Sequence, residues 1–356
     1  MIQKIRDIYA HLGDDESREI FEKRLLYSLT GDRRYIVEIV KNTVLYQKVC
    51  NILLQDKHRK YIVGAGQWGK IMADLFREFG IEGLLDNYVS GTYNGLQILP
   101  MKDFLQNTPE ASVYISSTTF HKELCEVIQE IGVESERVVD LAGMMLQVYH
   151  EQQYFDLPCL EQHREPHEVF VDGGCYDGAN SLRFIQWAGN AGKTVYAFEA
   201  DERNAERCRI ALEQIEGAEC HLVAKGMWSC DTLLNFCSKA NEASGLAENG
   251  HQRIPVTSLE SAVKEKVTFI KMDIEGAEYE ALKGAKNIIS GYHPKLAISV
   301  YHKTEDIWEL PQLILSFYPD YTFYLRHYSL SGEETVLYAV AKEKTDVVWT
   351  GSRKRN

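Results

Sequence analysis

From residue 60 onward, the sequence alternates short apolar runs with amphipathic segments, and it does so in two separate blocks. The first block runs from "KYIVGA" (60–65) to "RVVDL" (137–141), and the second runs from "VFVDGG" (169–174) to "KLAISVY" (295–301). This alternation favours parallel strands joined by crossover helices, because parallel neighbours need a long connection between them. The chain is therefore predicted to be an α/β protein with two largely parallel sheets.

The second block is followed by two further strand-like runs, "YTFYLRHY" (321–328) and "TVLYAVAK" (335–342), separated by the polar turn "SLSGEE" (329–334). Two such runs around a short polar loop predict a β-hairpin. The complete block predicts a seven-stranded, mostly parallel sheet with a terminal hairpin, and this arrangement resembles the sheet of class I methyltransferases. The first block is shorter and predicts a small Rossmann-like α/β domain.

The regions outside the two blocks complete the predicted domain organisation. The N-terminal segment has apolar residues at helical spacing and predicts two or three helices that serve in packing or in forming a homodimer. A polar, His-rich connector with Pro158 and Pro166 marks a domain boundary. The predicted parts are a helical extension (1–57), a Rossmann-like domain (58–145), a linker (146–167), a second α/β domain (168–345) and a disordered tail (346–356).

The overall charge and the cysteines narrow the class of protein. Lys and Arg number 39 against 52 Asp and Glu, so the net charge of −13 argues against nucleic acid as a partner. The eight cysteines form no C-x-x-C pair and no zinc-type spacing, which favours reduced thiols and predicts no metal ligand set of that kind. The charged N-terminus and the lack of a long apolar run predict neither a signal peptide nor a membrane span. We expect a cytoplasmic protein.

The first block contains a full match to the dinucleotide fingerprint G-x-G-x-x-G at Gly64, Gly66 and Gly69. Asp86 follows about 20 positions later, where a ribose-binding carboxylate is expected. One reading is therefore an NAD(P)-dependent oxidoreductase or sugar epimerase, although this domain is about half the size that such an enzyme needs. The loop is otherwise a nucleotide-sugar docking site or a scaffold, and the sequence leaves these alternatives open.

The second glycine loop, "VFVDGGCYDGAN" (169–180), differs because it carries the carboxylates Asp172 and Asp177. A pyrophosphate prefers the bare N–H groups of a helix N-terminus, and the two carboxylates would repel it. They suit a ligand with an ammonium and a sulfonium group, which is S-adenosyl-L-methionine. Glu199, at the end of the next strand, is placed to accept hydrogen bonds from the ribose hydroxyls. The predicted cofactor site consists of Asp172, Gly174, Tyr176, Asp177, Gly178, Glu199, Ala200, Gly226, Met227 and Asp273.

The later strand ends supply the candidate catalytic residues. Asp273 and Glu275 follow the fourth strand, and His302 follows the fifth, so all three are expected at the carboxyl edge of the sheet, where open α/β folds bind ligands. A histidine or carboxylate there is suited to removing a hydroxyl proton. Carboxylates also hold divalent metals, so a metal is possible, but none is indicated. Tyr301, Arg326 and His327 are the candidates for the substrate pocket.

Four segments together resemble the FkbM family of S-adenosylmethionine-dependent methyltransferases: "VFVDGGCYDGAN", "YAFEADERN", "FIKMDIEGAEYEALKGA" and "LAISVYHKTEDIWELPQLI". The resemblance covers about 168–342. It implies methyl transfer, usually to a hydroxyl of a sugar or a secondary metabolite. It also implies that Asp172, Gly174 and Gly178 contact the methionine part, and that Asp273 lies beside the reaction centre.

One position departs from the family pattern, because Ser299 stands where many members have a glutamate. This departure shifts the expected catalytic role towards His302. The segment 60–120 is similar to the small nucleotide-sugar-binding domain of some sugar acyltransferases. The expected partner is a small-molecule acceptor, and the remaining alternative is a non-catalytic binding or assembly module.

Overall fold

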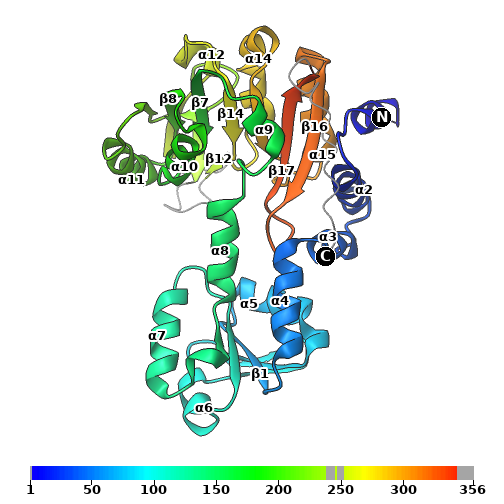
Figure 1. The fold of residues 1–356 in the computed structure, drawn as a ribbon, viewed down its shortest axis with the longest axis vertical. Coiled ribbons are helices and arrows are strands. Elements are labelled where there is room, and N and C mark those ends of the chain that lie inside the picture. Colours follow the sequence, from blue (N-terminus) through cyan, green and yellow to red (C-terminus); the bar gives the residue numbers. More distant parts are fainter. Residues whose placement is uncertain (1, 238–244, 247–251, 343–356) are drawn as a thin grey trace. The chain divides into compact units, whose positions relative to one another are not determined.

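The computed structural model describes residues 2–237, 245–246 and 252–342, and the chain divides into two compact units (Figure 1). Unit 1 comprises 1–31, 152–327 and 333–356, and unit 2 comprises 32–151 and 328–332. The predicted disordered tail at 346–356 lies outside the described residues.

Unit 1 is built on a seven-stranded sheet with the order β16-β17-β15-β14-β7-β8-β9. Its strands are β7 (His167–Gly173), β8 (Gly192–Phe198), β9 (Glu219–Val223), β14 (Phe269–Met272), β15 (Lys295–Ser299), β16 (Tyr321–His327) and β17 (Thr335–Ala341). Five strands are parallel, and β17 pairs antiparallel with both β15 and β16. The predicted seven-stranded sheet with an antiparallel terminal hairpin is confirmed.

Strand register brings the functional ends of the sheet together. In the pairing of β7 with β14, Asp172 lies opposite Lys271 and Gly173 lies opposite Met272. Both strands are buried along most of their length, as expected for parallel strands covered on both faces. The glycine loop after β7 and the acidic segment after β14 therefore leave the sheet side by side.

The helices of unit 1 connect these strands and cover the sheet. They are α1 (Ile2–Ala10), α2 (Asp15–Thr30), α9 (Pro158–Gln162), α10 (Ala179–Ala188), α11 (Glu202–Glu213), α12 (Leu259–Ala262), α13 (Glu278–Lys283), α14 (Lys286–Tyr292) and α15 (Asp306–Phe317). The sequence predicts one helix over 276–291, but the structure has two. Gly284 separates them, and a Cβ at that position would lie 2.1 Å from the carbonyl oxygen of Trp228, so the backbone is packed too closely there for any side chain.

Helix α2 lies against the edge strand β16 (Figure 1), and α1 packs against α15. The Ser17 hydroxyl accepts a hydrogen bond from the backbone N–H of Leu325, and Leu12 forms a β-bridge with Phe323. These contacts occupy backbone groups that an edge strand would otherwise expose. Packing within the chain is therefore one role of this helical segment, and its role in a homodimer stays a prediction.

The segment expected as one extension (1–57) is divided between the units, because α3 (Arg34–Lys41) and α4 (Val44–Gln55) belong to unit 2. The structure has four helices here where the sequence predicted two or three. The break at Thr43 has a local cause: its hydroxyl accepts a hydrogen bond from the N–H of Tyr46 and so caps the start of α4.

A second, four-stranded sheet in unit 1, with the order β10-β13-β11-β12, was not predicted. Its strands are β10 (Gly226–Met227), β11 (Thr232–Cys237), β12 (Gly245–Leu246) and β13 (Gln252–Thr257). Ile254 and Val256 form its buried centre, and Ala200 and Trp228 pack against them. Short strands with charged and polar neighbours gave too little alternation in the sequence to reveal this sheet.

Unit 2 contains a six-stranded sheet with the order β3-β4-β2-β1-β5-β6. Its strands are β1 (Lys60–Val63), β2 (Ile81–Leu85), β3 (Gly91–Tyr93), β4 (Leu96–Leu99), β5 (Ser112–Ile115) and β6 (Val138–Val139). Its other helices are α5 (Gln67–Leu75), α6 (Met101–Asn107), α7 (His121–Ile131) and α8 (Leu141–Glu151), and two 3-10 turns lie at Arg77–Phe79 and Ser135–Arg137.

The β3–β4 hairpin was also missed, although the sequence carried its signal. Asn94 and Gly95 form the turn with φ values of 48° and 81°. Two consecutive positive φ values are what a tight hairpin turn requires, and Asn-Gly is the favoured pair for it.

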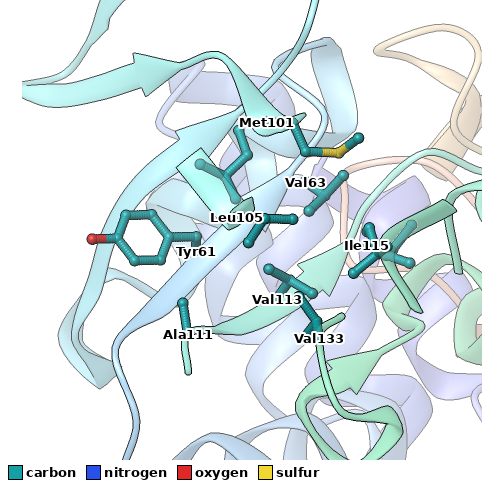
Figure 2. Close-up of a cluster of buried hydrophobic side chains, with 10 residues drawn as sticks. Tyr61, Val63, Met101, Leu105, Ala111, Val113, Ile115 and Val133 are labelled. Atoms are coloured by element: carbon teal, nitrogen blue, oxygen red, sulfur yellow. The ribbon is translucent and has the colours of Figure 1, made fainter. Parts of the chain in front are cut away.

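A buried apolar cluster stabilises unit 2 (Figure 2). Val63 of β1 and the pair Val113 and Ile115 of β5 contribute to it from the sheet, and Met101 and Leu105 contribute from α6. Alternate residues of neighbouring parallel strands share one face, so they form a continuous surface on which the helix packs. Within the described residues, no helix has the length and apolar character needed to cross a membrane.

Candidate active site

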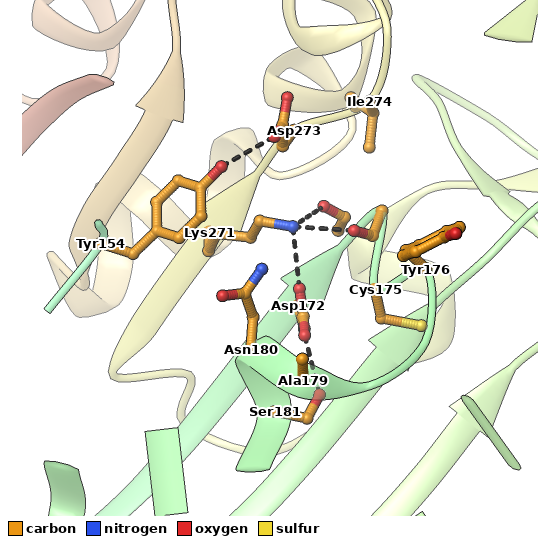
Figure 3. A network of polar contacts seen from close by, with 12 residues as sticks. Tyr154, Asp172, Cys175, Tyr176, Ala179, Asn180, Ser181, Lys271, Asp273 and Ile274 are labelled. Atoms are coloured by element: carbon orange, nitrogen blue, oxygen red, sulfur yellow. Dashed lines mark hydrogen bonds and ion pairs between the residues drawn. The ribbon is translucent and has the colours of Figure 1, made fainter. Parts of the chain in front are cut away.

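A buried lysine connects the glycine loop of unit 1 to the sheet (Figure 3). The Lys271 ammonium lies 3.1 Å from Asp172 Oδ1 and donates hydrogen bonds to the carbonyl oxygens of Gly173 (3.0 Å) and Gly174 (2.8 Å). Asp172 is fully buried, and its other oxygen accepts a hydrogen bond from Ser181. Burial alone would lower the pKa of Lys271, but the charges of Asp172 and Asp273 outweigh it and raise the pKa.

The glycines of this loop allow two strand ends to approach closely. Gly174 has a φ of 72°, and a Cβ there would lie 2.0 Å from the carbonyl oxygen of Asp273. A Cβ added at Gly173 would similarly lie 2.6 Å from the sulfur of Met227. The loop backbone is therefore in direct contact with the segment after β14, and Met227 lies beside the loop as predicted for a residue near the cofactor.

Glu199 lies at the end of β8, and 9% of it is exposed. Its Oε2 accepts a hydrogen bond from the N–H of Tyr176, and its Oε1 accepts one from the N–H of Asp201. Burial raises the pKa of Glu199. The backbone N–H of Ala200 also contributes a hydrogen bond, and because two carboxylate oxygens can accept four in all, the group retains capacity for a ribose hydroxyl.

The other predicted cofactor residues lie around this loop. Asp177 is exposed, and its side chain accepts a hydrogen bond from the N–H of Ala179, the first residue of α10. Gly178 has a φ of 84° and packs close to Cys208 of α11. Ala200 packs on the small second sheet. A Cβ added at Gly226 would lie 3.6 Å from the Cβ of Ala200.

Asp273, the first residue after β14, is held by two phenols. Tyr154 donates a hydrogen bond to Oδ2 at 2.7 Å (Figure 3), and Tyr301 donates one to Oδ1 at 3.1 Å. Burial and the neighbouring carboxylate raise the pKa values of both tyrosines well above the ordinary value, so both remain donors. Burial alone would raise the pKa of Asp273, but the positive charges of His302 and Lys271 outweigh it and lower the pKa.

His302 lies between three carboxylates. Its Nδ1 lies 2.9 Å from Glu278 Oε1, and its Nε2 lies 3.4 Å from Asp273 Oδ1 and 3.7 Å from Glu275 Oε1. Burial by itself would lower the pKa of His302, but the charge of Glu278 and contacts with Glu275 outweigh it and raise the pKa well above the ordinary value. The structure thus brings together all three predicted catalytic residues, Asp273, Glu275 and His302.

A fourth carboxylate, Glu334, approaches the same cluster from the turn before β17. It accepts a hydrogen bond from Gln153 and lies 3.3 Å from the Tyr301 hydroxyl. Burial and the charge of Asp273 raise the pKa of Glu334 to about 8. Glu334 and Tyr154 both have a positive φ, 62° and 71°, a backbone strain that proteins often place at functional sites.

Arg326 and His327, predicted for the substrate pocket, lie elsewhere in unit 1. Arg326 forms an ion pair with Asp14 at 2.6 Å, just before α2. The His327 ring contacts the Thr335 hydroxyl at 2.8 Å. The structure therefore places both in the packing of α2 and the terminal hairpin, whereas Tyr301 contacts Asp273.

The first glycine loop lies in unit 2. A Cβ at Gly69 would lie 1.8 Å from the carbonyl oxygen of Gly64, so this glycine lets α5 pack against the end of β1. Asp86 accepts hydrogen bonds from the N–H groups of Ala65, Tyr88 and Val89. Burial by itself would raise the pKa of Asp86, but the hydrogen bonds from these three N–H groups outweigh burial, and the pKa is lowered overall. Its carboxylate thus already orders the loops on both sides.

Sequence reasoning missed Lys271, Tyr154 and Glu334. A lysine inside the apolar run "FIKMD" was a usable signal, since a buried lysine needs an anionic partner. Tyr154 lies in the predicted linker and Glu334 in the predicted turn. Neither segment has a periodicity that reveals where its side chains point.

Residues 172–325 match the family model of the methyltransferase FkbM domain. None of the curated proteins is significantly similar to this chain.

Several solved structures are similar to this chain. Methyltransferase FkbM from Methylobacillus flagellatus KT is 21% identical, with 83% of this chain and 93% of that one covered and a TM-score of 0.49. An rRNA methylase from Streptococcus thermophilus is 16% identical (55% and 95% covered, TM-score 0.34). Aeropyrum pernix fibrillarin, with natively bound S-adenosyl-L-methionine, is 11% identical (55% and 74% covered, TM-score 0.33).

Proposed function

We propose that this S-adenosylmethionine-dependent methyltransferase, whose residues 172–325 form a methyltransferase FkbM domain, methylates a hydroxyl group of a sugar, a nucleotide-sugar or a secondary metabolite. The observation that carries the proposal is the direct contact between the glycine loop and Asp273. Gly174 can approach the Asp273 backbone only because it has no side chain. A proton-accepting carboxylate therefore lies immediately beside the loop predicted to hold the cofactor.

The residues around the loop fit S-adenosylmethionine. Gly173 and Gly174 let the loop pack directly against Met227 and Asp273, and Glu199 keeps acceptor capacity for the ribose hydroxyls. Asp172 is fully buried against Lys271, so it holds the loop in shape. When bound, the cofactor supplies an electrophilic methyl group on a positively charged sulfur.

The chain's own residues then align the acceptor and receive its proton. Tyr154 and Tyr301 fix the orientation of the Asp273 carboxylate, whose side chain is 23% exposed. The Asp273 carboxylate would receive the proton of the acceptor hydroxyl, while the bound cofactor would supply the methyl group and keep the electron pair of the broken carbon–sulfur bond on its sulfur. Alignment and proton removal together account for the catalysis that such a displacement needs.

Asp273 and His302 are the two candidate proton acceptors. The geometry favours Asp273, since the His302 side chain is only 9% exposed and contacts Asp273 and Glu278. Replacing Asp273 with Asn keeps the shape and removes the proton acceptor. We expect kcat to fall roughly 100-fold or more while cofactor binding persists.

Ligand-induced stabilisation is the primary test. S-adenosylhomocysteine at 100 times its Kd is expected to add about 2.7 kcal/mol to the free energy of unfolding, and Glu199→Ala is expected to weaken this effect. NAD serves as the comparison ligand. Stabilisation by NAD, with none by S-adenosylhomocysteine, would contradict the proposal and favour an oxidoreductase that uses the first glycine loop.

The acceptor class is tested with the tritiated methyl donor and panels of sugars, nucleotide-sugars and hydroxylated secondary metabolites. Label transferred to a hydroxyl oxygen, located by NMR of the product, is the expected result. Transfer only to nitrogen or carbon atoms would overturn the assignment of a hydroxyl acceptor and leave the methyltransferase activity intact.

A further inference from the structure

We infer that Asp273, Glu275 and His302 form a binding site for one divalent metal ion, with Glu278 orienting the histidine from the other side. The binding itself is independent of the acceptor, whereas the role of the metal in catalysis rests on the proposed function.

The distances around His302 Nε2 fit a coordination sphere better than direct pairing. Asp273 Oδ1 lies 3.4 Å away and Glu275 Oε1 lies 3.7 Å away. Charge-assisted hydrogen bonds between these groups close to about 2.7–2.9 Å. Two ligand atoms bound about 2.1 Å from one metal ion are separated by about 3.0–3.4 Å. The spacing therefore approaches that of ligands around a cation.

The histidine supplies an independent observation. Its side chain is 9% exposed, and among the described residues neither ring nitrogen has a hydrogen bond of good geometry, although both lie near carboxylates. A buried ring nitrogen without such a bond is energetically unfavourable unless something else occupies the space in front of it. Nε2 faces the two carboxylates, and a metal ion between the three would satisfy it.

The opposite side of the ring has the surroundings of a metal-binding histidine. Nδ1 lies 2.9 Å from Glu278 Oε1, and Glu278 is fully buried. Histidines that bind metals commonly place their second nitrogen against a carboxylate, which fixes the ring orientation. Within the described residues, Asp273, Glu278 and His302 offer ligand atoms that all lie within 4.8 Å of one another, so Glu278 is close enough to serve as a ligand as well.

The backbone of Glu275 supports the same assignment. Glu275 has a φ of 55°, a left-handed conformation that is costly for a glutamate, and Gly276 follows with a φ of 89°. Such strain persists where the surrounding structure imposes it, commonly at ligand sites. The Glu275 side chain is 34% exposed and that of Asp273 is 23% exposed, so this side of the cluster is accessible to an incoming ion.

The ligand set indicates the kind of metal. One imidazole nitrogen with two carboxylates suits Mn²⁺ or Zn²⁺ better than Ca²⁺, which prefers oxygen ligands alone. Three protein ligands leave coordination positions for an acceptor hydroxyl, whose pKa a bound metal lowers.

Direct Mn²⁺ binding tests the site. The full chain is dialysed against EDTA and then titrated with MnCl₂, and electron paramagnetic resonance follows the loss of the free-ion signal. We expect one saturable site per chain. His302→Ala and Glu275→Gln should each weaken binding by at least about 10-fold, and Glu278→Gln should weaken it by a similar factor through the ring.

Glu280→Gln is the matched control, because Glu280 lies on α13 with Glu278 but forms an ion pair with Lys283. It should bind Mn²⁺ with wild-type affinity. Circular dichroism and Tm establish that each variant is folded. If His302→Ala unfolds, Mn²⁺ binding by Glu275→Gln still tests the site, because Glu275 is partly exposed. Absence of saturable binding, or binding equally strong in the Glu275 and His302 variants, would overturn the inference.

The two proposals can fail separately. Mn²⁺ binding that depends on His302 and Glu275, without methyl transfer to any hydroxyl, would support the metal site and contradict the proposed function. Methyl transfer that continues at the same rate in EDTA, with no Mn²⁺ bound, would support the function and contradict the metal site.

Discussion

At the scale of single residues, the site depends on charges buried together. The side chains of Lys271 and Asp172 are 1% and 0% exposed, and each is the other's principal counter-charge. Lys271 also holds two carbonyl groups of the glycine loop. Removing one partner of such a pair leaves an uncompensated charge in a low-dielectric interior, which is more harmful than removing both.

Lys271→Met is therefore expected to lower the free energy of unfolding by about 3–5 kcal/mol, measured by urea denaturation. The double variant Lys271→Met with Asp172→Asn serves as the control. It should recover part of the loss, because no unpaired charge remains. A double variant less stable than Lys271→Met alone would show that the pairing is not the reason.

The sequence predicted part of the site at the level of single residues. Asp273, Tyr301 and His302 were expected together because each follows a parallel strand, and strand ends of one direction meet at one edge. Tyr154 and Glu334 could not be expected there. They reach Asp273 and Tyr301 through segments whose path is fixed by tertiary packing rather than by a repeating pattern.

At the scale of elements, close packing of strand and helix explains the first glycine loop. Gly69 lies under the Gly64 carbonyl, whereas an added Cβ at Gly66 would meet no atom within 4 Å. The fingerprint spacing thus combines one glycine needed for helix packing with one whose surface is open. The sequence shows the spacing but not this difference.

Gly69→Ala is expected to lower the free energy of unfolding by about 1–3 kcal/mol, because α5 must move away from β1. Gly66→Ala is the matched control in the same loop, and its stability should stay within about 0.5 kcal/mol of wild type. Chemical denaturation of both variants checks the pair. Equal destabilisation would contradict the packing explanation.

At the scale of the whole molecule, unit 1 includes segments from both ends of the chain, and unit 2 takes 328–332 from the terminal hairpin. Glu334 lies just after this segment, and burial of its carboxyl group raises its pKa from 4.5 to about 8. In the unfolded chain the same carboxyl ionises near its ordinary pKa. The unfolded state therefore releases a proton over a pH range in which the folded state keeps it.

Stability should respond to pH accordingly. The contribution of Glu334 is fully present below pH 4.5 and is lost as pH rises towards 8, because ionisation then favours the unfolded chain. Glu334→Gln cannot ionise, so its unfolding free energy should fall less over this range than that of wild type. Urea titrations at several pH values measure the difference. Parallel pH profiles for the two proteins would contradict the assignment.

The sequence by itself determined the two α/β blocks, the antiparallel terminal strand, and the meeting of Asp273, Glu275 and His302 at one sheet edge. Periodicity and strand direction are local properties, so a linear pattern can carry them. Only the tertiary structure decided the division of the N-terminal helices, the pairing of Lys271 with Asp172, and the approach of Tyr154 and Glu334 to the site. Those features depend on which distant segments pack together, and no repeating pattern in the chain records that.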